Sequence, residues 1–499
     1  MELTLMSKTP ALKGLELYRK IRNEFIGLNT KYLLANGETK KRIYLDSTAS
    51  TLMMKPAFDI MEKFLHHYAN THSEMHFDAK ISSREYQWVH DKILSFLNAD
   101  PNVYTCFFTG SGTTAAVNRM ARVFRDIRPE KDVAIVSIME HHSNDLPHRK
   151  HMKEVVHVPV EFNENQMLCV SLPLMEAELK KYGDRVNYVA VTGVSNVTGI
   201  INPLKKIAKL AHKYGALILV DGAQTAAHLP IEISNQDDPE ASFDAFVFSG
   251  HKTYVPGSPG VVVAKKAHLL AIEPEEVGGG MVKEVFETEY EVKTEFPDRE
   301  EAGTPNILGA IGLGAVIDVL DRIGMDVLEA EEDKIMAYAL EKMNEVEGLV
   351  IYGSTCMKTC PRAASISFNL RDIDHGLVAG VLNDYFNIAV RNQCFCAHPY
   401  VKEMLVADMK LNSTFTDIKE LKFSLGLKKG MVRASLGLYN TREDVDALVA
   451  ALDHITKNIE FYQSQYIVNE NETYVHKTFY FDHKTRFSIS GALDDMFKK

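Results

Sequence analysis

Short apolar runs alternate with amphipathic stretches over much of the chain. The runs with the composition of buried strands lie at 103–109, 132–139, 187–194, 216–224 and 243–252. Residues 113–127 and 201–215 repeat apolar positions with a helical period, and Gly215 is a typical helix stop. Alternating strands and helices are typical of βαβ units, so the pattern predicts an α/β fold with a mainly parallel main sheet.

The pattern changes after Pro305. A long helical stretch is predicted from Asn306 through Glu345, and shorter strands follow at 364–370 and 431–440. A chain of 499 residues is too long for one ordinary core, so we expect a second, smaller α+β domain joined by a long helix. The predicted divisions are an N-terminal helical segment at 1–43, a large domain at 44–305, a connecting helix with the small domain at 306–460, and an aromatic-rich C-terminal extension at 461–499.

Composition and charge exclude several classes of protein. Hydrophobic residues make up 45% and charged residues 25%, as in ordinary globular proteins. The net charge of −11 argues against nucleic acid as a partner. No apolar run approaches the roughly 20 residues of a membrane span, and the first residues lack the apolar core of a secretion signal, so no membrane association is expected. Residues 273–301 carry eleven carboxylates against three basic residues, which we interpret as a solvated face.

The cysteines predict a reducing environment. There are six in 499 residues, too few for a disulfide scaffold, and the cytoplasm is therefore the expected location. The spacings of Cys356 with Cys360 and of Cys394 with Cys396 differ from the usual zinc patterns, so no metal site is predicted.

Polar residues gather directly after the predicted strands, where open α/β sheets bind ligands. The first strand is followed by the glycine-rich turn 110–114, whose backbone and helix start suit a phosphate. The second is followed by Glu140-His141-His142-Ser143-Asn144, in which one imidazole could stack on a planar ligand. Asp221 closes the fourth run, and Lys252 closes the fifth.

Each of these features alone has an ordinary structural explanation; their combination points to one ligand. A lysine removed from water loses its proton more readily and can bond an aldehyde. A carboxylate such as Asp221 can keep a pyridine nitrogen protonated. Phosphate, flat ring, basic ring nitrogen and aldehyde together describe pyridoxal phosphate.

Eight motifs extend this interpretation to most of the chain. In order, they are YLDSTAS (44–50), GTTAAVN (112–118), EHHSNDLP (140–147), SNVTGIINPLKKI (195–207), VDGAQTAAHLP (220–230), FSGHK (248–252), EAGTPN (301–306) and VRASLGLYNT (432–441). Together they resemble class V aminotransferase-fold enzymes, specifically the cysteine desulfurases and selenocysteine lyases, over 44–448. The resemblance implies the pyridoxal-phosphate-dependent transferase fold of type I, as in aspartate aminotransferase.

The resemblance also implies a role for individual residues. Lys252 would bond the cofactor, Asp221 would pair with the ring nitrogen, Gln224 would bind the phenolic oxygen and His141 would stack on the ring. Asn196 would lie near ring and substrate, and Arg433 would bind the substrate carboxylate. The residues implied for phosphate are Thr113, Thr114, Ser249, His251 and, reaching the neighbouring subunit of a homodimer, Thr304.

The segment AVRNQCFCAHPY at 389–400 corresponds to the part of the desulfurases that carries the catalytic cysteine. Related enzymes read Arg-x-Gly-His-His-Cys-Ala; here Arg391 precedes Cys396 by five residues, but 393–395 read Gln-Cys-Phe. The Cys-Phe-Cys pattern resembles that of molybdenum-cofactor sulfurases. Cys396 is the expected sulfur carrier, with Cys394 as the alternative, and Arg391 is expected near the substrate.

The function expected from this resemblance is a cysteine desulfurase. It would convert L-cysteine, or a related amino acid, to alanine, hold the sulfur as a persulfide on Cys396 and pass it to an acceptor protein. The altered residues at 393–395 keep other reactions open: a selenocysteine lyase, an aminotransferase, a β-lyase or an epimerase. A scaffold without activity is the third possibility, against which Lys252, Asp221 and Arg433 argue.

Overall fold

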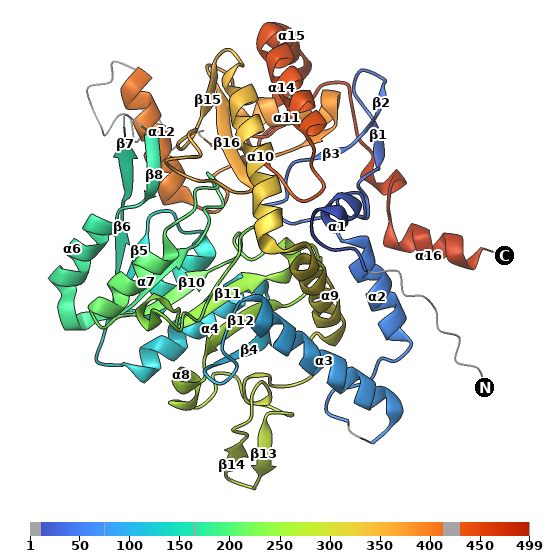
Figure 1. Cartoon of the computed structure of the whole chain (residues 1–499). Coiled ribbons are helices and arrows are strands. Elements are labelled where there is room, and N and C mark those ends of the chain that lie inside the picture. Colours follow the sequence, from blue (N-terminus) through green and yellow to red (C-terminus); the bar gives the residue numbers. More distant parts are fainter. Residues whose placement is uncertain (1–10, 74, 164–165, 413–429, 499) are drawn as a thin grey trace.

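The computed structural model describes residues 11–73, 75–163, 166–412 and 430–498. At its centre lies a seven-stranded sheet (Figure 1). Its strands, in spatial order, are β4 (Tyr104–Thr109), β12 (Gly260–Lys265), β11 (Ala245–Ser249), β10 (Leu217–Asp221), β9 (Val186–Thr192), β5 (Val133–Ser137) and β6 (Glu154–Val158). β12 pairs antiparallel with both β11 and β4, and the remaining neighbouring strands of this sheet pair in parallel. The five predicted strands are all present; β6 and β12 were not predicted.

Successive side chains of these strands enter different hydrophobic clusters. In β10, Ile218 and Val220 belong to the largest cluster, while Leu217 and Leu219 belong to another. Helices therefore cover both faces of the sheet, which explains why the strands read as unbroken apolar runs rather than alternating ones. The covering helices include α3 (Phe77–Phe96), α4 (Gly112–Ile127), α6 (Leu172–Tyr182), α7 (Leu204–Lys213) and α9 (Ile307–Ile323).

The long helix predicted from Asn306 through Glu345 is wrong as a single element. The structure has two helices, α9 and α10 (Met325–Asn344), which meet at Gly324. The φ of Gly324 is +86°, a conformation that ends α9 and that other residues rarely adopt. α9 packs on α2 (Lys55–Leu65) and α3, while α10 leads into the second sheet.

The second sheet is antiparallel and has four strands. Their order is β15 (Leu349–Ile351), β16 (Ser365–Leu370), β19 (Met431–Ser435) and β18 (Arg391–Gln393). Together with α10, α11 (His375–Phe386) and α14 (Arg442–Lys457), it encloses a hydrophobic cluster of its own. Between β18 and α12 (His398–Asn412) lies a short turn that contains Cys396.

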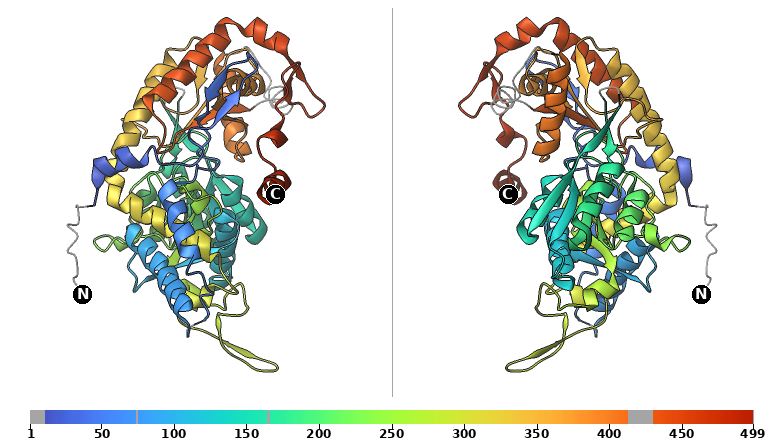
Figure 2. Two further views of the ribbon diagram at one scale, coloured as in Figure 1. Left: turned by 90° about the vertical axis from the view of Figure 1, so that its right-hand side faces the viewer. Right: turned by 90° about the vertical axis from the view of Figure 1, so that its left-hand side faces the viewer.

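The C-terminal extension lies beside the first hairpin of the chain, although α1 (Gly14–Ile21) and the C-terminal end lie on opposite sides of the molecule (Figure 2). After α1, the strands β1 (Lys31–Leu33) and β2 (Thr39–Lys41) form a hairpin. The C-terminal extension comprises α15 (Ile459–Gln465), the hairpin of β20 (Tyr466–Val468) and β21 (Tyr474–His476), and α16 (Ile489–Phe497). The rings of Tyr32 and Phe481 meet edge to face at 5.6 Å, which joins this extension to the first hairpin.

The acidic segment 273–301 is only partly a solvated face. Its hairpin, β13 (Val282–Val285) with β14 (Tyr290–Val292), projects from the body of the molecule (Figures 1 and 2). Glu300 and Glu301, by contrast, are 2% and 8% exposed, so the interpretation is wrong for them.

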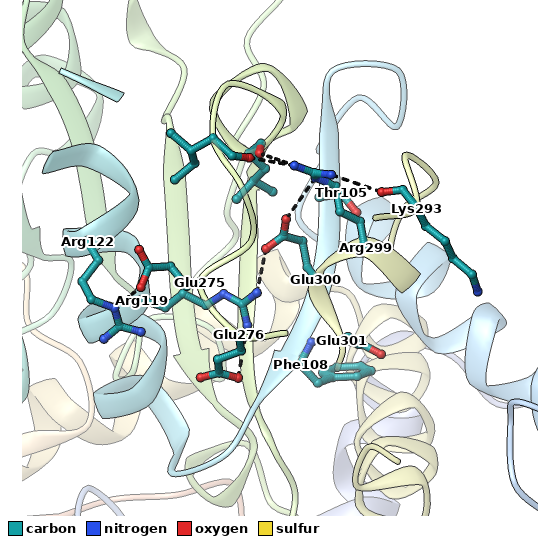
Figure 3. A network of polar contacts seen from close by, with 12 residues as sticks. Thr105, Phe108, Arg119, Arg122, Glu275, Glu276, Lys293, Arg299, Glu300 and Glu301 are labelled. Carbon is teal, nitrogen blue, oxygen red and sulfur yellow. Dashed lines mark hydrogen bonds and ion pairs between the residues drawn. The ribbon is translucent and has the colours of Figure 1, made fainter. Parts of the chain in front are cut away.

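These two glutamates are the centre of a polar network (Figure 3). The buried guanidinium of Arg119 in α4 donates to Glu300 Oε2 at 2.7 Å. Glu301 accepts from Tyr86 Oη at 2.5 Å and from the amide of Phe108 at 2.7 Å, and lies 3.0 Å from His90 Nε2. Burial of these carboxylates is tolerated because each has donors from other elements.

Candidate active site

A cavity of about 200 Å³ opens at the carboxyl ends of the parallel strands. The segments that follow the five predicted strands, β4, β5, β9, β10 and β11, deliver side chains to it, as expected for an open α/β sheet. Of the predicted site residues, those that line the cavity are Thr113, Thr114, His141, Asn196, Asp221, Gln224, Ser249, His251 and Lys252.

Lys252 and Asp221 supply the charges inside this cavity. Asp221 ends β10 and is 3% exposed; Lys252 follows β11 in a short 3-10 turn. Burial lowers the pKa of Lys252 from 10.5 to about 8, although the Asp221 carboxylate acts in the opposite direction. About a tenth of the amine is therefore unprotonated at pH 7, far more than at the ordinary pKa of 10.5, and in this state the nitrogen is a nucleophile and a base.

One end of the cavity is a cradle of backbone and hydroxyl groups at the start of α4. Gly112 has a φ of +59°, and a Cβ at this position would lie 2.6 Å from Ser249 Oγ. The amide of Thr113 donates to the same Ser249 oxygen at 2.7 Å. Thr114 Oγ1 lies 2.7 Å from the hydroxyl of Ser143, a lining residue that the sequence analysis missed. Hydroxyls at a helix N-terminus suit a phosphate.

His141 also lines the cavity, on a turn that its neighbour Glu140 ties to β9. The buried Glu140 carboxylate accepts from the amide of Thr192 at 3.1 Å and from Asn144 Nδ2 at 2.6 Å, which ties the turn after β5 to β9. Burial lowers the pKa of His141 to about 3, with Lys252 adding to the effect. The imidazole of His141 is therefore neutral and can pack flat on an aromatic ligand.

Gln224 and Asn196 are oriented by backbone oxygens from distant segments. Gln224 Nε2 donates to the carbonyl of Thr48 at 2.8 Å, and Asn196 Nδ2 donates to the carbonyl of Phe395 at 2.7 Å. The second bond joins the wall of the cavity to the turn that carries Cys396.

Arg433 and Arg391 lie directly opposite each other on β19 and β18. Arg433 is 2% exposed; its guanidinium donates to the carbonyl of Asn196 at 2.9 Å and to Asp46 Oδ1 at 3.2 Å. The ring of Phe395 lies 4.8 Å from the guanidinium carbon. Among the described residues, Arg433 Nε is buried without an acceptor. Asp46, which lies within the YLDSTAS motif, was missed as a neighbour of this arginine.

The turn that carries Cys396 is held by hydrogen bonds from other segments. Phe395 and Cys396 have φ values of +51° and +55°, which are costly for residues other than glycine. The amide of His142 donates to the carbonyl of Cys396 at 2.7 Å, and Asn196 Nδ2 donates to the preceding carbonyl, that of Phe395. Cys396 does not line the cavity, but its thiolate would act electrostatically on both Lys252 and Arg433.

Thr304 lies outside the cavity of its own chain. It is exposed on the loop that follows Glu300 and Glu301, where Asn70 Nδ2 donates to its hydroxyl at 2.9 Å. His72 Nε2 lies 2.9 Å from the carbonyl of the adjacent Gly303.

Within the described ranges, the side chains of His, Cys, Asp and Glu form no cluster of three that could hold a metal ion. In the same ranges, we find no helix with the length and apolarity needed to cross a membrane.

Comparison with known families agrees with this geometry. The profile of the family "Aminotransferase class-V" matches residues 43–448. The chain belongs to the class-V aminotransferase family. Among its class-V relatives, the probable cysteine desulfurase of Halalkalibacterium halodurans is 35% identical over 417 residues, which are 82% of this chain and 92% of that protein. The cysteine desulfurase of Yersinia pseudotuberculosis is 34% identical over 420 residues, 83% of this chain and 93% of the relative.

Solved structures of class-V enzymes confirm the predicted fold class. The cysteine desulfurase of Thermococcus onnurineus superposes with a TM-score of 0.72 at 28% identity, covering 90% of this chain and 99% of the other. The cysteine desulfurase CsdA of Escherichia coli superposes with a TM-score of 0.68 at 27% identity, covering 88% and 98%. The family assignment made from the motifs is thus confirmed, and with it the fold of type I.

Proposed function

We propose that this protein is a pyridoxal-phosphate-dependent cysteine desulfurase that converts L-cysteine to L-alanine and takes up the sulfur on Cys396. The observation that carries the proposal is the buried Lys252 amine, with its pKa lowered to about 8, in one cavity with the buried Asp221 carboxylate. The cysteine desulfurases among the relatives support the substrate class.

The donor groups of the cavity fit pyridoxal phosphate. Thr113, Thr114, Ser249 and His251 would hold the phosphate at the start of α4, where the lack of a Cβ at Gly112 leaves the approach open. Asp221 would hold the ring nitrogen. Bound pyridoxal phosphate supplies an aldehyde that bonds amines and a protonated ring that withdraws electrons from the substrate.

Lys252 has two tasks in this proposal. Its unprotonated Nζ would hold the cofactor through the aldehyde, and the same amine would serve as the base that takes the proton from the substrate Cα. Arg433 and Arg391 bind the substrate carboxylate. The buried, acceptor-less Nε of Arg433 supports this role, since a buried donor without an acceptor is destabilising and an anionic oxygen would satisfy it.

Cys396 then removes the sulfur. Its thiolate Sγ forms a bond with the substrate sulfur while the substrate Cβ–S bond breaks; the electron pair of that bond remains on the carbon skeleton, which takes up protons and leaves as alanine. L-cysteine and one protein thiol thus become alanine and one protein persulfide, and the persulfide is passed to a thiol of an acceptor protein. Burial raises the pKa of Cys394, which makes this residue a poorer source of the attacking thiolate.

Substitution of the two cysteines tests the assignment. Treatment of the holoenzyme with L-cysteine is expected to add one sulfur atom to the peptide containing Cys396, detected by mass spectrometry, and to release alanine. Cys396→Ser should abolish both products, whereas Cys394→Ser, two residues away, should retain alanine formation. Alanine formation by Cys396→Ser, with elemental sulfur from L-cysteine or elemental selenium from L-selenocysteine as coproduct, would replace the proposal with a lyase that needs no protein persulfide.

Assembly and location extend the same proposal. Thr304 is exposed, lies outside its own cavity and is held by Asn70, which supports a homodimer in which it reaches the phosphate of the neighbouring site. The six cysteines favour the reducing cytoplasm as the place of action.

A further inference from the structure

Two histidines from distant segments meet beside the Cys396 turn. His142 begins the 3-10 turn after β5, and His398 begins α12, two residues beyond Cys396. Their ring centroids are 4.8 Å apart with an angle of 12° between the planes, and His398 Nδ1 lies 2.9 Å from His142 Nε2. The turn is thus held to His142 at two points, through the carbonyl of Cys396 and through the ring of His398.

The protons of this pair can be assigned from its hydrogen bonds. The backbone amide of His398 also points to His142 Nε2, at 3.3 Å. An amide can only donate, so His142 Nε2 is an unprotonated acceptor, and the 2.9 Å bond takes its proton from His398 Nδ1. Protonation of His142 at Nε2 would remove the acceptor for both bonds and would place a cation against the His398 ring.

The charged surroundings keep His142 neutral near neutral pH. Burial and His398 lower its pKa below the ordinary 6.5. Of the charged groups that face it, Asp145 favours the cation and Arg149 opposes it. The Asp145 carboxylate is already engaged by Arg149 at 2.7 Å and by His157 at 2.8 Å. His398 is exposed, so protons have access to the pair from solvent.

We propose that His142 and His398 form a clasp that positions the Cys396 turn over the active site and opens on acidification, which releases the thiol to solvent. The left-handed conformation of Phe395 and Cys396 makes such ties necessary, because the strained backbone must be held from outside. The inference rests on the proposed function of Cys396 as the sulfur carrier. Both histidines act as positioning residues, through the backbone of the turn.

The clasp can be tested without catalysis, by alkylation of the protein with iodoacetamide and quantification of each cysteine peptide by mass spectrometry. The exposed Cys356 serves as an internal reference for reagent reactivity. In the unaltered protein, the ratio of Cys396 to Cys356 labelling is expected to rise as the pH falls from about 7.5 to about 4.5, a range that extends well below the ordinary pKa of histidine because the pKa of His142 is lowered.

Two substitutions of His398 test whether the hydrogen bond that it donates to His142 holds the Cys396 turn. His398→Leu removes the donor, so the labelling ratio should be about tenfold higher at neutral pH, the order expected for the loss of one or two hydrogen bonds, and nearly independent of pH. His398→Asn retains a donor near the position of Nδ1 but cannot be protonated, so labelling should stay low at neutral pH.

Equal labelling ratios in His398→Leu and the unaltered protein, at both ends of the pH range, would overturn the clasp. A rise in His398→Asn as large as that in His398→Leu would also overturn it, since the donor would then be irrelevant. The proposed function fails independently, if Cys396 takes up no sulfur from L-cysteine while its labelling follows the clasp.

Discussion

At the scale of single residues, the site depends on the Lys252 amine, whose pKa is set by two opposing effects. Desolvation lowers the pKa of Lys252, while Asp221 partly restores it. Arg433 and Arg391 add to the lowering. The same carboxylate that would hold the cofactor ring therefore also adjusts the readiness of the lysine to bond it.

The reactivity of Lys252 in the cofactor-free protein should report this balance. Acylation of its amine by acetic anhydride is expected to rise with pH around a midpoint near 8, because only the unprotonated amine reacts. Asp221→Asn should move the midpoint to lower pH, since the carboxylate that stabilises the ammonium is gone. Labelling of the exposed Lys283 gives the reference at each pH. A midpoint that rises in Asp221→Asn would contradict the electrostatic account.

The sequence predicted those site residues that stand directly after strands. Lys252, Asp221 and His141 were predicted in this way, because the carboxyl ends of parallel strands meet at one edge, and all three line the cavity. Asp46 and the pairing of His142 with His398 were not found. They depend on contacts between segments hundreds of residues apart, for which one sequence carries no local signal.

At the scale of elements, the proposed phosphate site at the start of α4 leaves no room for a side chain at Gly112. Its opening turn combines a left-handed Gly112 with the Ser249 hydroxyl and the Thr113 amide. A side chain at this position would meet both steric and conformational resistance.

Two glycines of this turn provide a matched pair. Gly112→Ala is expected to weaken binding of pyridoxal phosphate to the cofactor-free protein at least about tenfold, because the added Cβ would crowd Ser249 and strain the turn. Gly110→Ala should have little effect, since no atom lies within 4 Å of its added Cβ. Affinity is measured by absorbance titration. Similar losses in both variants would mean that the cradle is not built on this geometry.

Buried strands and their order along the chain were predictable, but two kinds of feature were not. The break at Gly324 was overlooked because both sides of it continue a helical pattern, and only a left-handed φ separates α9 from α10. β12 was overlooked because its antiparallel direction does not fit the repeating βαβ scheme.

At the scale of the whole molecule, the buried Glu300 and Glu301 connect helices and a strand that lie far from them in the sequence. Glu301 joins α3 through Tyr86 and His90 and joins β4 through Phe108. Glu300 joins α4 through Arg119 (Figure 3). The loop that carries Thr304 begins at this junction, so its position depends on the packing of the main sheet.

Removal of one of these carboxylates should therefore destabilise the fold. Glu301→Ala leaves the buried donors Tyr86 and Phe108 without their acceptor and is expected to cost about 3 kcal/mol in the free energy of unfolding. Glu284→Ala, on the projecting hairpin, should change it by less than about 0.5 kcal/mol. Thermal and denaturant unfolding measure the free energy of unfolding of both variants. Equal values for Glu301→Ala and Glu284→Ala would show that the polar network around Glu301 is not needed for stability.

The active-site wall also joins the beginning of the chain to its last third. β3 (Ile43–Tyr44) pairs with β17 (Ile388–Ala389), and Asp46 pairs with Arg433. During synthesis on the ribosome, the polypeptide must therefore emerge at least as far as Arg433 before the wall can close. A nascent chain carries Lys252 long before it has a finished chamber around that amine, so the proposed capture of pyridoxal phosphate would have to follow closure of the wall.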